Sequence, residues 1–163
     1  SLELDRGFAS VIREWQRGDE VVLRLPMPIR MTECHPAVEA NRNRIVFTRG
    51  PLVLWAEGID NGGATQRFFF ENLPDTENAT LTKNRTEHGS FMQAKIAAPS
   101  VTEDGRVRAG KLVLTPYYAW NNRGISSMTC WFPRDKSQAV FDPHALPEES
   151  IFTEISALSL IHI

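Results

Sequence analysis

Short apolar segments of strand length, separated by turn-forming residues, dominate this sequence of 163 residues. Residues 20–25 show the pattern, since Val21, Leu23 and Leu25 fall on one face of an extended chain, with Val22 and Arg24 on the other. Further strands are predicted at residues 44–48, 52–57, 91–97, 111–115 and 126–132. Because glycine, proline, asparagine and aspartate separate these segments, the sequence predicts an all-β fold, an antiparallel, jelly-roll-like β-sandwich.

The N-terminal part predicts a hairpin of its own. Residues 9–15 and 20–25 are its two strands, and Gln-Arg-Gly-Asp at 16–19 is the turn between them. Pro26 and Pro28 follow, and proline donates no backbone hydrogen bond to a sheet. We therefore expect a domain boundary near residue 28, with the main sandwich over residues 29–147.

The polar segments predict connections. Residues 60–63 have the composition of a loop, and residues 72–87 are predicted as a long polar connection. The tail, residues 148–163, is ambiguous. Ile151, Ile155 and Leu158 fit one helical stripe, while residues 158–160 alternate as in a strand.

Composition bounds the function classes. A hydrophobic fraction of 42% is enough for a packed core, and a net charge of −2 gives no reason to expect nucleic acid or an anionic membrane as partner. No apolar run reaches the roughly 20 residues of a membrane-spanning helix. The chain starts with Ser1 directly ahead of an apolar pattern, which suggests a piece of a longer protein.

An aromatic block follows the predicted strand at 111–115. Tyr117, Tyr118 and Trp120 are succeeded by a corner, Asn-Asn-Arg-Gly, that contains Asn122 and Arg123. Together with Trp55, these residues are the candidates for a contact surface. Packing against the core or another domain is one interpretation, and stacking on sugar rings is the other.

No set of residues assembles a catalytic or metal site in the sequence. Cys34 and Cys130 are far apart and no Cys-x-x-Cys motif is present, so we expect two reduced thiols and no metal ligands. Glu57 and Asp60 lie near a predicted strand end, and we expect solvated acids there, because charged side chains are mostly exposed.

Three blocks of residues, in this order, resemble one family. They are Ile-Arg-Glu-Trp, Gly-Asp and Leu-Pro-Met within residues 12–27, Asn-Arg-Asn-Arg-Ile-Val and Arg-Gly-Pro-Leu-Val within residues 41–53, and Pro-Tyr-Tyr-Ala-Trp-Asn-Asn-Arg-Gly at residues 116–124. The resemblance is to the C-terminal part of the bacterial β-L-arabinofuranosidase-like glycoside hydrolases, formerly catalogued as a domain of unknown function. It covers most of residues 8–132.

The resemblance implies an architecture for the parent protein. A catalytic (α/α)6 barrel is followed by two β-sandwiches, so residues 1–28 would end the first sandwich and residues 29–147 would form the second. The family's nucleophile is a zinc-bound cysteine and its acid/base a glutamate, both in the upstream barrel. Cys34 and Cys130 do not match that metal site, so no catalytic residue and no cofactor is expected in this chain.

Two functions therefore remain open from the sequence. The first is an accessory β-sandwich that supports the upstream barrel of the same parent chain, or subunit assembly, including a homo-oligomer. The alternative is a carbohydrate-binding module that holds an oligosaccharide on exposed aromatics.

Overall fold

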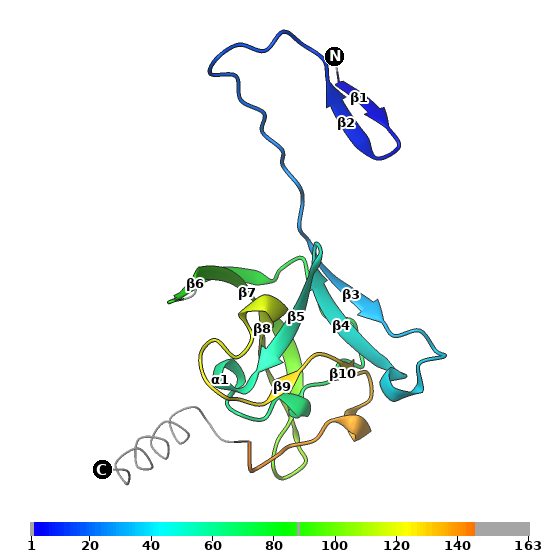
Figure 1. Cartoon of the computed structure of the whole chain (residues 1–163). Helices are drawn as coiled ribbons and strands as arrows, with labels where there is room; N and C mark the ends of the chain where they lie inside the picture. The colour runs from blue at the N-terminus through cyan, green and yellow to red at the C-terminus, as the bar shows by residue number, and fades with distance from the viewer. Residues whose placement is uncertain (1, 88, 146–163) are drawn as a thin grey trace, which may run out of the picture.

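The computed structural model describes residues 2–87 and 89–145, which are almost entirely β-structure (Figure 1). The strands are β1 (Leu2–Asp5), β2 (Phe8–Val11), β3 (Ile29–Glu33), β4 (Arg44–Arg49), β5 (Leu52–Glu57), β6 (Thr80–Thr86), β7 (Gly89–Val101), β8 (Val107–Pro116), β9 (Met128–Thr129) and β10 (Phe132–Pro133). The helical elements are the short helix α1 (Gly58–Asn61) and four 3-10 turns at Glu39–Asn41, Thr65–Arg67, Tyr117–Ala119 and Lys136–Gln138.

All strand pairs are antiparallel, as the sequence predicted. The main sheet has the order β10-β4-β5-β8-β7-β6, with β3 also paired to β4 and β9 to β5. Only Leu54 and Trp55 of β5 pair with β8, so this short contact joins one half, built around β4, to the other half, built around β7 and β8. The two halves pack across a common core and form the expected sandwich.

The core follows from the alternation of the long strands. In β7, Ala94, Ile96 and Ala98 are buried, while Lys95 and Ala97 between them are exposed. Leu112 and Leu114 of β8 pair with Ile96 and Ala94 and lie on the same side. Across the core stand Ile45, Phe47 and Leu54 of the other half, completed by Phe68, Phe70 and Phe132.

Three phenylalanine rings form the centre of this core. The ring centroids of Phe47 and Phe70 lie 5.2 Å apart, and Phe132 lies 5.8 Å from each of them. Edge-on and tilted contacts of this kind are the preferred geometry for aromatic pairs. Phe70 comes from an irregular segment and Phe132 from a two-residue strand, so the rings anchor chain that has little sheet pairing of its own.

The predicted N-terminal hairpin is wrong in its position. The hairpin of the structure is β1–β2, whereas residues 20–25 form no strand and expose Val21, Leu23 and Leu25. The turn at residues 16–19 is present, since Asp19 donates its N–H to the Gln16 carbonyl. Alternation alone does not create a strand where no neighbouring strand supplies hydrogen bonds. Residues 12–28 instead extend as an arm between the hairpin and the sandwich (Figure 1).

Other expectations are also corrected. The polar segment 72–87 contains β6, which runs along β7, and the first two residues of the loop predicted at 60–63 belong to α1. The strand predicted at 126–132 divides into β9 and β10, which pair with different partners. The tail lies outside the described residues. Within residues 2–87 and 89–145, no helix is long and apolar enough to cross a membrane.

We expect Phe47→Ala to lower the free energy of unfolding by about 3–5 kcal/mol, because it leaves a cavity where three rings meet. The exposed Val140 provides the control, and Val140→Ala should change this free energy by less than about 0.5 kcal/mol. Urea denaturation followed by tryptophan fluorescence measures both. Similar values for the two variants would contradict the assignment of the core.

The arm and hairpin expose many apolar side chains, among them Leu4, Phe8, Val22 and Leu23. We expect this surface to drive self-association, because contact with a second copy removes it from water. Light scattering on the full chain should then give a dimer or larger, and a version starting at Ile29 should be monomeric. Equal monomeric masses would show that the arm does not mediate association.

Candidate functional site

The face of the sheet opposite the hydrophobic core carries the candidate site. Along β5, Leu54 and Ala56 point into the core, so the alternate residues Trp55 and Glu57 fall on the other face. Trp55 pairs with Thr115 of β8, which lies on that face too. We call this side of the sheet the outer face.

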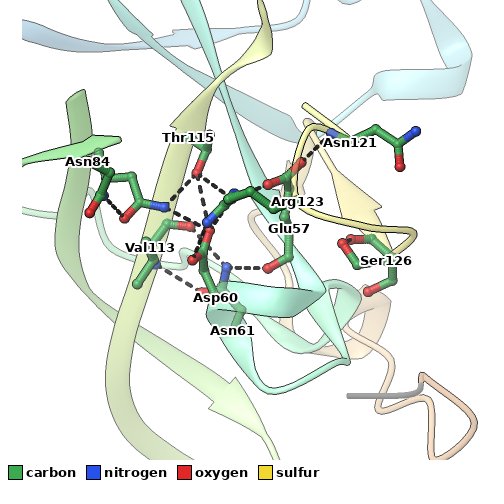
Figure 2. A network of polar contacts seen from close by, with 11 residues as sticks. Glu57, Asp60, Asn61, Asn84, Val113, Thr115, Asn121, Arg123 and Ser126 are labelled. Carbon is green, nitrogen blue, oxygen red and sulfur yellow. Dashed lines mark hydrogen bonds and ion pairs between the residues drawn. The ribbon is translucent and has the colours of Figure 1, made fainter. Parts of the chain in front are cut away.

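Arg123 binds two carboxylates on the outer face (Figure 2). Its Nη1 donates to Asp60 Oδ1 at 2.7 Å and its Nη2 to Asp60 Oδ2 at 2.6 Å, a bidentate pairing. Nη2 also pairs with Glu57 Oε2. The guanidinium therefore lies between the two acids. We call this trio of Arg123, Glu57 and Asp60 the Arg123 clamp.

Neutral side chains extend the clamp across the neighbouring strands. Gln93 of β7 donates through Nε2 to Asp60 Oδ2 at 2.8 Å and to Thr115 Oγ1 at 3.0 Å. Asn84 of the edge strand β6 donates to Gln93 Oε1. Side chains from β5, α1, β6, β7 and β8 thus meet the Arg123 loop in one network (Figure 2).

The clamp also fixes the path of the loop that follows β8. The backbone N–H of Asn121 donates to Glu57 Oε1 at 2.9 Å. Asn121 and Gly124 take φ values of 60° and 115°, which asparagine and glycine adopt more readily than other residues. The polar corner predicted from the sequence is therefore present, and buried carboxylate oxygens hold both its backbone and its arginine.

The acids are not solvated, contrary to the sequence expectation. The Glu57 side chain is 2% exposed, Asp60 16% and Arg123 19%. Burial alone would lower the pKa of Arg123, but the hydrogen bond and charge of Asp60, together with Glu57, outweigh it and raise the pKa above its ordinary value. Arg123 also lies over the ring of Phe91. Two carboxylates share one permanent cation here, and the guanidinium fills the space between them.

Aromatic rings gather beside the clamp. The ring centroids of Trp55 and Tyr117 are 4.6 Å apart, and Trp120 lies 6.4 Å from Trp55 and 6.2 Å from Tyr117, all with nearly parallel planes. Tyr117 is 51% exposed, Trp120 39% and Tyr118 57%. We call Trp55, Tyr117, Tyr118 and Trp120 the aromatic surface. The aromatic surface therefore lies on the outer face beside the Arg123 clamp, on the side of the sheet away from the hydrophobic core.

Most residues singled out from the sequence come together. Trp55, Tyr117 and Trp120 stack, Arg123 is the centre of the clamp, and Tyr118 and Asn122 are exposed on the same loop. Sequence reasoning missed the roles of Glu57, Asp60, Gln93 and Thr115. The alternation of β5 could have placed Glu57 beside Trp55, but no local signal joins Glu57 and Asp60 to an arginine more than sixty positions away.

The described residues do not fit the zinc site that the family resemblance implies for the whole enzyme. Within residues 2–87 and 89–145, no group of three or more histidine, cysteine, aspartate or glutamate side chains could hold a metal ion. Cys34 and Cys130 are both free thiols. Burial raises the pKa of the Cys130 thiol, which disfavours the thiolate needed for metal binding.

The model of the glycoside hydrolase family 127 C-terminal domain matches residues 29–133. The chain belongs to this family. The match begins at the first strand of the sandwich and ends at β10, so the family 127 domain includes the clamp and the aromatic surface.

Relatives of known identity agree with the family 127 assignment. The chain is 28% identical over 143 residues to a non-reducing end β-L-arabinofuranosidase of Bifidobacterium longum subsp. longum, covering 77% of this chain and 21% of that protein.

Solved structures of the family are similar to this chain. A family 127 β-L-arabinofuranosidase from Geobacillus stearothermophilus T6 matches at 26% identity with a TM-score of 0.59, over 66% of this chain and 18% of that one. A second family 127 β-arabinofuranosidase matches at 26% identity and a TM-score of 0.65, over 86% and 22%. The chain thus spans about a fifth of the length of these relatives.

We expect Arg123→Met to lower the free energy of unfolding by about 3 kcal/mol, because it leaves two buried carboxylates without their cation. Arg134→Met is the matched control, since Arg134 pairs with Glu33 in a more exposed position and should contribute less than about 1 kcal/mol. Adding Glu57→Gln and Asp60→Asn to Arg123→Met should recover part of the loss. Urea unfolding of all variants measures this, and equal losses for the two arginines would contradict the clamp.

Proposed function

We propose that residues 29–145 act as a non-catalytic accessory β-sandwich of a family 127 glycoside hydrolase, which docks on other parts of its parent protein through the aromatic surface. In this proposal the partner is the catalytic (α/α)6 barrel, upstream in the same chain. The domain supports the barrel and leaves bond cleavage to it.

The observation that carries the proposal is the contrast between the aromatic surface and the Arg123 clamp beside it. Exposed aromatic side chains are typical of contact surfaces, because they bury a large area with few rotatable bonds. Here they lie on a loop fixed by buried charges, so little conformational entropy remains to be lost on docking. A rigid aromatic platform is what a permanent inter-domain contact requires.

The chemistry of the clamp supports a structural role. Glycoside hydrolysis usually needs two carboxyl groups, or one carboxyl group and another nucleophile, that face each other across the substrate. Glu57 and Asp60 are instead bridged by Arg123, which occupies the place of a substrate. We therefore propose that the nucleophile, the acid/base and the catalytic zinc all belong to the upstream barrel.

The arm fits the same proposal. One relative aligns with 86% of this chain, a larger share than residues 29–163 can supply, so part of the segment before Ile29 aligns as well. We propose that β1, β2 and the arm belong to a preceding sandwich of the parent protein. Their exposed apolar side chains would be covered there.

The parallel stacking of the rings favours docking over sugar binding. Trp55 and Tyr117 face each other at 4.6 Å, so one face of each ring is already occupied. A sugar-binding platform needs ring faces open to the ligand. Titration of the chain with arabino-oligosaccharides should accordingly give no saturable heat, and a saturable signal lost in Trp120→Ala would favour the binding-module alternative.

The docking proposal predicts a stability effect that depends on the rest of the enzyme. Replacing Tyr117 and Trp120 by alanine should lower the melting temperature of the complete parent protein more than that of the isolated chain. The exposed Leu73 provides the control, since Leu73→Ala should affect neither. Differential scanning calorimetry measures both proteins. Equal shifts in the two proteins would contradict docking, and hydrolysis of an aryl arabinofuranoside by the isolated chain would contradict the non-catalytic role.

A further inference from the structure

Strand β8 has one edge that is only partly paired. From Val107 to Leu114 it pairs with β7, but on the other side only Thr115 and Pro116 pair with β5. Beyond that point β5 continues into α1 and no described strand takes its place. Residues 107–111, on that stretch of β8, are all exposed.

The side chain of Asn61 closes the first position of this edge. Its Nδ2 donates to the Val113 carbonyl at 2.9 Å, and the Val113 N–H donates to its Oδ1 at 2.9 Å (Figure 2). These are the two hydrogen bonds that a residue of a neighbouring strand would make. They show that the backbone groups of Val113 point away from β7.

In an antiparallel strand the backbone N–H and carbonyl groups of every second residue point to the same side, so those of Lys111 and Ala109 also point away from β7. The partner of Ala109 on β7 is Pro99, which has no N–H and whose carbonyl accepts a hydrogen bond from Phe69 on the far side. This confirms that the Ala109–Pro99 pair exchanges no hydrogen bonds. Among the described residues, no group binds the backbone N–H or carbonyl of Ala109 or Lys111 across the open edge.

A cationic cavity lies along this open edge. It has a volume of about 400 Å³, and residues 108–111 of β8 line it together with Arg67, Glu103, Phe68 and Phe141. Ser100 of β7 and Thr102 after it complete the lining, so the cavity reaches from the edge of β8 to the end of β7. Three of the lining residues, Arg67, Arg108 and Lys111, are cations, and one is a carboxylate. In the part of the chain that the structure describes, none of these three cations forms an ion pair.

Arg67 is the least satisfied of these cations. Its Nη2 donates to the Asn61 carbonyl at 2.8 Å, but its Nε is buried and has no partner among the described residues. Burial, followed by the nearby charge of Arg108, lowers the pKa of Arg67 below its ordinary value. A carboxylate placed in the cavity would offset both effects, since it neutralises the two cations together.

We propose that the open edge of β8, at Ala109 and Lys111, binds an extended acidic peptide segment of a partner polypeptide by strand addition. The backbone of the peptide pairs with Ala109 and Lys111, the two edge positions of β8 that follow the one occupied by the Asn61 side chain at Val113. Acidic side chains on one face of the added strand lie toward Arg67 and Arg108, while Lys111 lies on the other face of β8. This peptide-binding edge is separate from the aromatic surface and goes beyond the accessory role proposed above.

A peptide fits this place better than a small anion. A phosphate or a single carboxylate would use the cations and leave the row of backbone donors and acceptors unpaired. Strand addition uses both, because main-chain hydrogen bonds supply affinity and the flanking charges supply selectivity. Ala109 and Gly110 carry small or no side chains, so a neighbouring strand can approach the edge closely.

The test measures binding of short, capped, fluorescein-labelled peptides to the full chain by fluorescence anisotropy. A peptide of alternating glutamate and valine should bind saturably. The lysine–valine counterpart, and a glutamate–valine peptide with N-methylated alternate residues, should both bind at least about fivefold more weakly, because each loses one of the two kinds of contact. The acidic peptide should also shift the amide signals of Ala109 and Lys111 in an NMR spectrum.

Matched variants separate the backbone contribution from the charge contribution. Ala109→Pro removes one edge N–H and should weaken binding about fivefold, while Ala109→Ser keeps that N–H and should bind as the unaltered chain does. Arg108→Glu should weaken binding strongly, whereas Arg106→Glu, which alters a cation already paired with Asp104 and outside the cavity, should have little effect.

Three results would overturn the proposal. They are equal affinity for the acidic and basic peptides, equal affinity for the N-methylated peptide, and an unchanged affinity in Arg108→Glu. Equal affinity for the N-methylated peptide would mean that the cavity binds charge alone. Should Ala109→Pro fail to fold, the N-methylated peptide still tests the backbone contribution on the unaltered chain.

Discussion

The Arg123 clamp is the interaction on which the outer face depends. A single guanidinium joins the end of β5, the helix α1 and the loop after β8, which are distant in sequence. Buried carboxylates are costly unless they are paired and hydrogen-bonded, and here Arg123, Gln93 and the Asn121 N–H supply the partners. Because the same groups fix the loop, the position of the aromatic surface follows from the neutralisation of two acids.

The sandwich therefore has two interiors of different chemistry. Between its halves, phenylalanine, leucine and isoleucine side chains exclude water without directional preference. On the outer face, charged and amide groups require defined partners at defined distances, so they tolerate fewer arrangements. The apolar interior supplies most of the stability, while the polar one determines where the surface residues lie.

The sequence predicted the parts of the fold that depend on local pattern. Alternation located β4, β5, β7 and β8, because each has one face in the apolar core. It missed β6, whose edge position and polar composition leave little apolar signal. It also placed a strand at residues 20–25, with which no strand among the described residues pairs. The aromatic residues were identified, but the clamp was not, since its partners meet only through the fold.

The pair of hydrogen bonds between Asn61 and Val113 has a consequence for how the sheet can vary. Usually the hydrogen-bonded part of a strand edge ends where the neighbouring strand turns away. At Val113 of β8, the last hydrogen bonds on this edge come instead from one amide side chain, that of Asn61. A single substitution at Asn61 can therefore lengthen the accessible border of β8 while every strand keeps its course.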